Sequence, residues 1–312
     1  MRVTLIHNPG AGSQSEADAQ KLMNLLEDAG HEVHYQSAKD DNWHKALEQP
    51  AELVVVAGGD GTVSRVAKRM VGRGIPVTPL PAGTANNISR TLGLVDRPWE
   101  ELVRGWENAR RVKLDVGIAQ GPWGERYFVE GVGAGLFACL LGSSDPARKL
   151  AALKRPDERV AYALEMLNQR ALDCPPVEMK ATLDGKDISG RYILFETLNI
   201  LYVGPNLFLA PDSQPGDGSF DVVLVTEGER DRLKNYLLTW QTNRERISVL
   251  QSHRGKHLHI EANGFELHID DELWPEEGAG HAPEQGAIDL KIIDAVEFLA
   301  PDSKKKGARA PL

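Results

Sequence analysis

An apolar segment that runs into a glycine-rich turn and then into a helix constrains the fold of this chain most strongly. Residues 54–57 read Val-Val-Val-Ala, residues 58–62 read Gly-Gly-Asp-Gly-Thr, and apolar side chains then recur at helical spacing through residues 63–71. Such a turn aims free backbone N–H groups at a bound anion, at the positive end of the helix. The pattern predicts a phosphate-binding turn. The alternative is a tight turn with a solvent-facing Asp60.

Two more turns follow the same plan. Residues 8–12 read Asn-Pro-Gly-Ala-Gly after a first apolar segment. Residues 79–87 read Pro-Leu-Pro-Ala-Gly-Thr-Ala-Asn-Asn after another, and residues 88–92 continue as a helix. Strands that alternate with helices in this way predict a parallel α/β arrangement.

Together the motifs at 8–12, 58–62 and 81–86 resemble the diacylglycerol kinase catalytic family, which includes bacterial lipid kinases and sphingosine kinases. Similar motifs continue at Gly204-Pro205, Ala210-Pro211, Asp217-Gly218 and Ile269-Asp270-Asp271-Glu272. The resemblance covers nearly the whole chain. It implies an α/β protein of two lobes, an N-terminal Rossmann-like nucleotide-binding domain and a C-terminal, mostly antiparallel β-sandwich domain, with the active site between them.

After about residue 112 the rhythm changes from alternating strands and helices to closely spaced strand-like segments. We expect a nucleotide-binding domain at 1–112 and a β-rich lipid-substrate and metal domain at 113–291. The segment from about 292 to 312 is expected to pack back on the first domain, as the resemblance implies.

Composition agrees with a soluble enzyme and argues against some partners. The chain has 312 residues, of which 41% are hydrophobic, and a net charge of −9, which argues against nucleic-acid binding. No apolar segment is long enough to span a membrane, and no signal peptide is evident. We expect a cytoplasmic protein that meets a lipid substrate at the membrane surface, peripheral to the inner face. A homodimer is left open.

The resemblance implies transfer of the γ-phosphoryl group of ATP to a lipid hydroxyl, with Mg²⁺. This chemistry needs phosphate positioning, charge neutralisation and a group that receives the hydroxyl proton. The positions that match the family's nucleotide contacts are Asn8, Ser37, Gly58, Gly59, Asp60, Gly61, Thr62, Ser64 and Thr84. Asx turns, loop polar residues and helix caps are the plain alternatives.

The candidate catalytic acids are Asp270 and Glu272, which follow an alternating run ending at Ile269. Strand alternation would place Asp270 and Glu272 on one face. By resemblance, one accepts the hydroxyl proton while the other orients the acceptor or a metal. An exposed acidic loop is the alternative.

A separate loop at 210–219 is rich in Asp, Pro and Gly. The resemblance suggests a structural Mg²⁺ here, held by the Asp217 carboxylate and by the Gln214 and Ser219 carbonyls; oxygen ligands of this kind suit Mg²⁺. A β-turn is the alternative. Asp115 is expected either in an acidic network with Asp60 or as an exposed strand aspartate.

Arg65, Asn87 and Asp271 depart from the family pattern, in which carboxylates often occupy the first two positions and glycine the third. Two other functions therefore stay open. An NAD kinase shares the Gly-Gly-Asp-Gly-Thr motif, although residues 81–86 favour lipid kinases. A catalytically silent lipid- or nucleotide-binding protein is the other.

Two segments could touch a membrane. A helical stripe of Leu233, Tyr236, Leu237 and Trp240, near Arg244 and Arg246, is either interfacial or core, and we favour core. The basic residues at 304–309 either contact anionic head groups or form a solubilising end.

Overall fold

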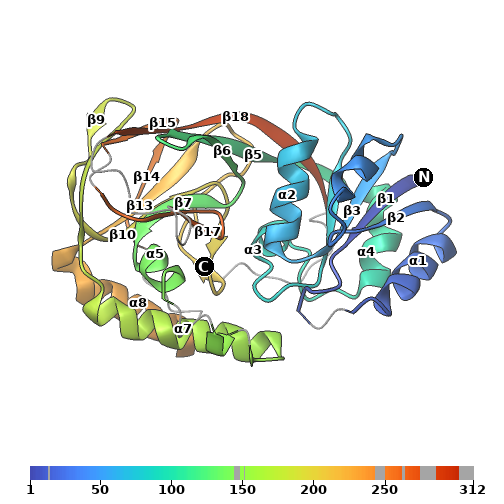
Figure 1. Ribbon diagram of the computed structural model, residues 1–312, viewed down its shortest axis with the longest axis horizontal. Helices are drawn as coiled ribbons and strands as arrows, with labels where there is room; N and C mark the ends of the chain where they lie inside the picture. Colours follow the sequence, from blue (N-terminus) through green and yellow to red (C-terminus); the bar gives the residue numbers. More distant parts are fainter. Residues whose placement is uncertain are drawn as a thin grey trace.

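The computed structural model describes residues 1–12, 15–143, 148–150, 152–242, 250–261, 264–274 and 286–301. A part with alternating strands and helices lies at one end of the molecule, and a strand-rich part lies at the other (Figure 1). The long strands β5 and β18 run between them. The predicted fold class, α/β with a second domain rich in antiparallel strands, is confirmed.

Parallel strands form the N-terminal sheet in the order β2-β1-β3-β4. Their bounds are β1 Arg2–His7, β2 Glu32–Ser37, β3 Leu53–Gly58 and β4 Val77–Pro81. The helices of this part are α1 Asp18–Asp28, η1 Trp43–Glu48, α2 Asp60–Met70, α3 Asn87–Thr91, α4 Trp99–Gly105 and η2 Trp106–Asn108. All of β3 is buried, which explains its continuous apolar sequence.

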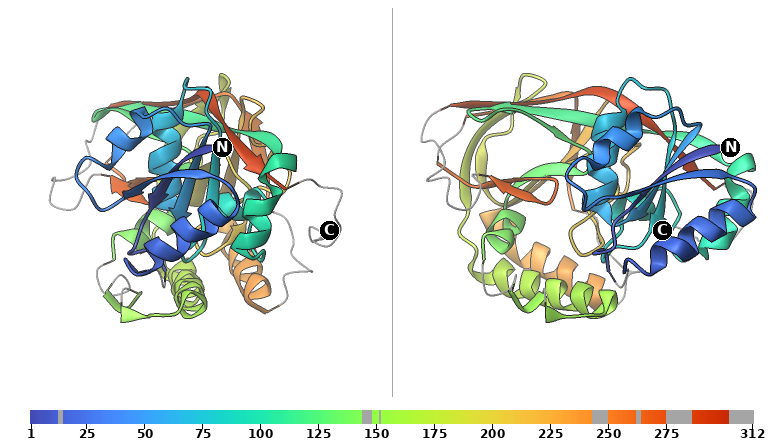
Figure 2. Two further views of the ribbon diagram at one scale, coloured as in Figure 1. Left: turned by 90° about the vertical axis from the view of Figure 1, so that its right-hand side faces the viewer. Right: turned by 45° about the vertical axis from the view of Figure 1, so that its right-hand side comes forward.

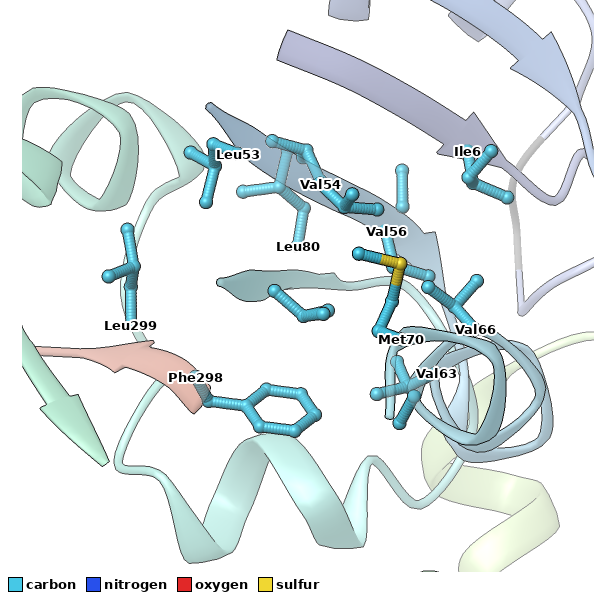
Figure 3. Packing of buried hydrophobic residues seen from close by; sticks show 14 of the residues in the cluster. Ile6, Leu53, Val54, Val56, Val63, Val66, Met70, Leu80, Phe298 and Leu299 are labelled. Carbon is cyan, nitrogen blue, oxygen red and sulfur yellow. The ribbon is translucent and has the colours of Figure 1, made fainter. Parts of the chain in front are cut away.

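Helix α2 packs its apolar stripe on this sheet. Val63, Val66 and Met70 are at most 2% exposed. They lie beside Val56 of β3 and near Phe298 of β18 (Figure 3). This packing fixes the first turn of α2 at the carboxyl end of β3, the edge where the loops after β1 and β4 also emerge.

The strand-rich part pairs its strands in antiparallel fashion. Its strands are β7 Gly131–Gly135, β8 Val177–Leu183, β9 Lys186–Asp187, β10 Gly190–Leu198, β11 Tyr202–Val203, β12 Leu207–Phe208, β13 Phe220–Thr226, β14 Ser252–Gly255, β15 His257–Glu261, β16 Leu267–Ile269 and β17 Glu272–Trp274. Apolar side chains from β7, β10, β13 and β16 meet others from β5, β8, β15 and β18 in one core, which makes this part a sandwich.

The long strands connect the two parts. Strand β5 (Arg110–Gly121) pairs with β6 (Gly124–Phe128) and, in antiparallel fashion, with β18 (Ala287–Ala300). Near its end, β18 pairs in parallel with β4 at Phe298 and Val77. Figure 2 shows β18 passing from the strand-rich part into the N-terminal sheet. Because β5 and β18 run unbroken through residues 112 and 291, those two boundaries stay predictions.

Helices cover one side of the strand-rich part: α5 Leu136–Leu141, α7 Pro156–Asp173, η3 Glu227–Glu229 and α8 Arg230–Thr242 (Figure 1). The stripe on α8 is buried, so its interpretation as core is confirmed. Arg244, Arg246 and residues 304–309 lie outside the described residues. Within the residues that the structure describes, no helix is long and apolar enough to cross a membrane.

Candidate active site

The glycine turn at 58–62 starts α2 directly at the end of β3. The carbonyl of Gly59, the N-cap residue, accepts hydrogen bonds from the Thr62 and Val63 amides at 3.0 Å. A Cβ on Gly59 would lie 2.9 Å from the Cα of Gly83, and one on Gly83 would lie 2.4 Å from the Cα of Gly59. The two glycine turns therefore pack backbone against backbone, and a side chain at either position would push them apart.

Side-chain amides fix the loops after β1 and β4. Asn8 donates from Nδ2 to Thr62 Oγ1 at 2.9 Å and accepts at Oδ1 from the Gly10 amide at 3.0 Å. Asn86 adopts a left-handed conformation with φ 55°, and its side chain bonds the amide and the carbonyl of Gly83 at 2.8 and 3.0 Å. These contacts shape the carboxyl edge of the sheet in advance of any ligand.

A polar cavity of about 480 Å³ lies over this edge. Of the predicted nucleotide-binding residues, those that line it are Asn8, Gly59, Gly61, Thr62, Ser64 and Thr84. Asp60 lines the adjoining cavity instead. Gly58 is buried under the turn, where a Cβ would lie 2.9 Å from that of Thr62. Ser37 ends β2, and its Oγ accepts a hydrogen bond from the Lys39 amide at 3.3 Å.

A second, mostly apolar cavity of about 400 Å³ adjoins the first. Its apolar wall comes from α5, from α7, from Leu150 between these helices, and from β11 with the loop after it: Phe137, Leu140, Leu141, Leu150, Val160, Ala163, Val203 and Pro205. Gly61, Thr84, Arg159 and Asp271 line both cavities. The two cavities therefore meet at the first turn of α2.

Carboxyl groups gather where the cavities meet. Asp60 accepts a hydrogen bond at Oδ1 from the Ile88 amide at 2.9 Å. Burial raises the pKa of Asp60 to about 6, and the negative charge of Asp271 adds to this rise. Burial and the neighbouring acids raise the pKa of Glu130 well above its usual value. Asp60 therefore gains and loses a proton close to neutral pH, whereas the uncharged form of Glu130 is favoured.

The carboxylate of Asp270 is buried, and both of its oxygens accept hydrogen bonds. Its Oδ1 accepts hydrogen bonds from the amides of Val129, Glu130 and Gly131 at 3.0, 2.8 and 3.3 Å. Its Oδ2 accepts one from Ser64 Oγ at 2.6 Å. The Lys68 ammonium lies 2.7 Å from that same Oδ2. Asp270 thus joins the strand-rich part to α2.

Asp270 and Asp271 form the tip of the hairpin between β16 and β17, in which Ile269 pairs with Glu272. The chain turns at Asp270, where φ is 52°, so strand alternation ends at Ile269 and does not carry Asp270 and Glu272 to one face. Glu272 is exposed and lines the polar cavity. Asp271 Oδ2 lies 2.8 Å from where a Cβ of Gly61 would be. Asp271 therefore stands against the first turn of α2.

The loop at 214–219 lies apart from this region. Asp217 forms an ion pair with Arg254 and accepts a hydrogen bond from the Ser219 amide at 3.0 Å. Asp115 accepts hydrogen bonds from the amides of Gly216 and Gly218 at 3.0 and 3.1 Å. Among the described residues, no group of three or more His, Cys, Asp or Glu side chains is arranged to hold a metal ion. The predicted site of Asp217, Gln214 and Ser219 stays a prediction.

Several residues of this region were not predicted as site residues from the sequence. Lys68 follows Ser64 by one helical turn, so both reach the same carboxylate, and this spacing could have been noticed. Arg159 on α7 lines both cavities, and its buried Nε atom has no hydrogen-bond partner among the described residues. No sequence pattern near Glu130 or Arg159 indicates that the fold brings these residues close to α2.

Similarity to known proteins agrees with this arrangement. Residues 2–118 match the family model of the diacylglycerol kinase catalytic domain. The chain is 28% identical over 235 residues to a diacylglycerol kinase of Bacillus subtilis, covering 72% of this chain and 73% of that protein. It is 26% identical over 231 residues to a diacylglycerol kinase of Mycobacterium tuberculosis, covering 72% of each.

Solved structures show the same fold. A crystal structure of a diacylglycerol kinase from Bacillus anthracis superposes with a TM-score of 0.69 at 22% identity, over 97% of this chain and 98% of that one. A second crystal structure from the same bacterium gives a TM-score of 0.72 at 21% identity. The matched domain and the curated relatives indicate a lipid kinase. More narrowly, residues 2–118 are similar to the diacylglycerol kinase catalytic domain.

Proposed function

We propose that this lipid kinase uses ATP and Mg²⁺ to phosphorylate the hydroxyl group of an uncharged lipid of the diacylglycerol type. The observation that carries the proposal is the meeting of a polar cavity with an apolar one at Gly61, Thr84, Arg159 and Asp271. A nucleotide in the first and a lipid in the second would bring a terminal phosphate and a hydroxyl group together. Positioning of this kind supplies much of the catalysis in phosphoryl transfer.

The polar cavity suits the phosphate groups of ATP. The glycine turns and the amides of Asp60 and Gly61, which precede the hydrogen bonds of Thr62 and Val63 to Gly59, offer donors at a positive helix end. No side chain intervenes at Gly59 or Gly83. Arg159 brings a guanidinium group to the junction, and its unpartnered Nε can donate to a phosphate oxygen. We propose that these groups hold the triphosphate and neutralise the charge on the transferred phosphoryl group.

Asp60 is the residue that we propose as proton acceptor. The lipid hydroxyl oxygen attacks the γ-phosphorus, the bond between that phosphorus and the bridging oxygen of ADP breaks, and Asp60 takes the hydroxyl proton. A pKa of about 6 leaves Asp60 ionised at neutral pH while keeping its proton affinity useful. This proposal gives Asp270 a positioning role and leaves Glu272 at the polar cavity.

Asp271 is the residue that we propose as holder of Mg²⁺ at the polar cavity. Its carboxylate offers the hard oxygen ligands that Mg²⁺ prefers, and it lines the cavity assigned to the phosphates. The metal would neutralise charge on the phosphates. The 214–219 loop remains the second proposed magnesium site.

The acceptor class follows from the charge of the lipid cavity. Asp60 and Asp271 present carboxyl groups to it, whereas Asp270 is paired with Lys68 and the uncharged form of Glu130 is favoured. Arg159 and His268, which is paired with Glu196, are the basic residues of its described lining. An anionic head group would be repelled there unless a cation accompanied it. An uncharged lipid alcohol avoids this cost. The relatives from Bacillus subtilis and Mycobacterium tuberculosis carry the name diacylglycerol kinase, which agrees with such an acceptor. We propose that the enzyme collects this lipid at the membrane surface.

The test uses purified protein, γ-labelled ATP and Mg²⁺, with diacylglycerol or phosphatidylglycerol in separate detergent micelles and NAD⁺ in a further reaction. We expect label in phosphatidic acid with wild type and none with Asp60→Asn. The variant should still bind ATP. Label in NADP⁺ would identify an NAD kinase. ATP binding without any labelled product would contradict the proposed kinase activity and favour a silent binding protein.

A further inference from the structure

Glu196 on β10 and His268 on β16 contact each other across β7, the strand that lies between them. Gly133 on β7 pairs with Glu196 on β10 at one side and with His268 on β16 at the other. A Cβ on Gly133 would lie 2.1 Å from Glu196 Oε1, so the carboxylate occupies the space that a side chain there would fill. Only glycine at this position lets the Glu196 carboxylate pass over β7 and reach the imidazole.

The pair is buried and fully engaged. Glu196 is 0% exposed and His268 is 3% exposed. His268 Nε2 lies 2.8 and 3.0 Å from the two carboxylate oxygens, and its Nδ1 lies 2.8 Å from the carbonyl oxygen of Asp270. Because a carbonyl oxygen only accepts hydrogen bonds, Nδ1 carries a hydrogen. Glu196 therefore fixes the ring so that Nδ1–H points at the hairpin tip.

Asp270 is consequently held at both ends. His268 binds its carbonyl, while residues 129–131, Ser64 and Lys68 bind its carboxylate. The left-handed φ of 52° at this non-glycine residue is a conformation that needs such support. Asp271 follows directly and stands against the first turn of α2.

We propose that Glu196 and His268 are positioning residues for phosphoryl transfer: they hold the β16–β17 hairpin tip so that the Asp271 carboxylate stays at the junction of the two cavities. This inference rests on the proposed function. His268 also lines the lipid cavity, whereas Glu196 lies behind it and acts through the imidazole. A misplacement of about 1 Å in a reacting constellation costs on the order of 10²-fold in rate, so the pair matters through the position that it gives to the hairpin tip.

The test compares two double variants that differ in a single donor. Glu196→Met with His268→Asn keeps an N–H donor at the position of Nδ1, and Glu196→Met with His268→Leu has the same shape without it. Replacing both partners by uncharged groups avoids a lone buried charge. At saturating ATP and lipid we expect kcat of the Leu variant to fall at least about tenfold below that of the Asn variant. The ATP affinity should match between the two, and because His268 also lines the lipid cavity, kcat is compared only at saturating lipid.

Two controls separate positioning from stability. His259→Asn removes a histidine that contacts Asp289 away from the cavities, and it should leave kcat unchanged. The unfolding temperatures of the two double variants should lie close together, because a purely structural role would lower stability and not kcat alone. Equal kcat values in the two double variants would overturn the proposal.

A readout without activity keeps the test independent of the proposed function. The amides of residues 129–131 donate to the Asp270 carboxylate, so loosening of the tip should speed their hydrogen exchange in the Leu variant relative to the Asn variant. Equal exchange would overturn the proposal even if no lipid were ever phosphorylated. Absence of lipid phosphorylation by wild type would instead contradict the proposed function.

Discussion

The start of α2 and the tip of the β16–β17 hairpin each present an aspartate to the same region, but in different surroundings. Asp270 at the tip is occupied by the amides of residues 129–131 and by the Lys68 ammonium at 2.7 Å. Asp60 accepts hydrogen bonds from the amides of residues 86–88 but has no cation partner among the described residues, and burial raises its pKa to about 6. Both accept from backbone amides, but the carboxylate that is also paired with an ammonium group holds structure, whereas the buried one without a cation keeps a raised proton affinity and is suited to proton transfer.

The largest expected effect that sharpens this comparison comes from Asp60→Asn. Without a proton acceptor, kcat should fall on the order of 10³-fold. The folded-state pKa of Asp60 is raised, so ionisation of this carboxyl at pH 7 disfavours the folded state. The substitution should therefore raise the free energy of unfolding at pH 7 by about 1 kcal/mol, after discounting for partial exposure. Steady-state kinetics and chemical denaturation measure the two effects; a loss of stability together with near-normal kcat would contradict both.

Asp270→Asn should act in the opposite direction on stability. The substitution leaves Lys68, whose side chain is 24% exposed, without its carboxylate partner. We expect the free energy of unfolding to fall by about 3 kcal/mol, as for removal of one member of a buried pair. Denaturant titration at pH 7 provides the measurement.

The double variant Asp270→Asn with Lys68→Met is the control. It should recover part of the lost stability, because the unpaired ammonium is removed as well. If Asp270→Asn instead lowered kcat as much as Asp60→Asn while leaving stability unchanged, the prediction from sequence that Asp270 takes the proton would be favoured.

The acid limb of the pH profile is the next largest effect. Asp60 must be ionised to accept a proton, so kcat/KM should fall about tenfold per pH unit below pH 6. Asp271→Asn removes a negative charge that raises the pKa of Asp60, and should move this limb to lower pH. Glu130 also faces this cavity and is the further acid to be compared by Glu130→Gln. A limb that stays in place in Asp271→Asn would assign it to another group.

A feature of the fold or the site could be predicted from the sequence when the residues that form it are close together in the chain, and not when they are far apart. The glycine turns were predictable because strand, turn and helix are contiguous at 53–70, and the fold class followed from their repetition. The surroundings of Asp270 were not, since its amide donors at 129–131 and its cation Lys68 come from other elements. Strand alternation gave the wrong expectation for Asp270 and Glu272 because the chain turns after Ile269.

The apolar cavity and the Glu196–His268 pair show the same limit. The cavity wall combines α5, α7 and the loop after β11, and no local pattern relates these segments. Glu196 and His268 meet only because Gly133, on the strand between them, lacks a side chain. A glycine within a strand does mark a close approach, but its sequence neighbours do not say of what.

The smallest expected effect concerns the acidic loop at 214–219. Its Asp217 carboxylate resembles that of Asp270, because a cation and a backbone amide already bind it. Arg254 is 41% exposed and Asp217 is 27% exposed, so their ion pair contributes little. Without a bound metal, Asp217→Asn should lower the free energy of unfolding by less than about 1 kcal/mol.

If the predicted Mg²⁺ binds there, wild type should melt at a higher temperature in Mg²⁺ than in chelator, and Asp217→Asn should lose that difference. Arg254→Gln is the matched control, because it frees the carboxylate and should increase the response to Mg²⁺. Equal melting temperatures of wild type and Arg254→Gln with and without chelator would leave the loop a hydrogen-bonded turn around Asp115.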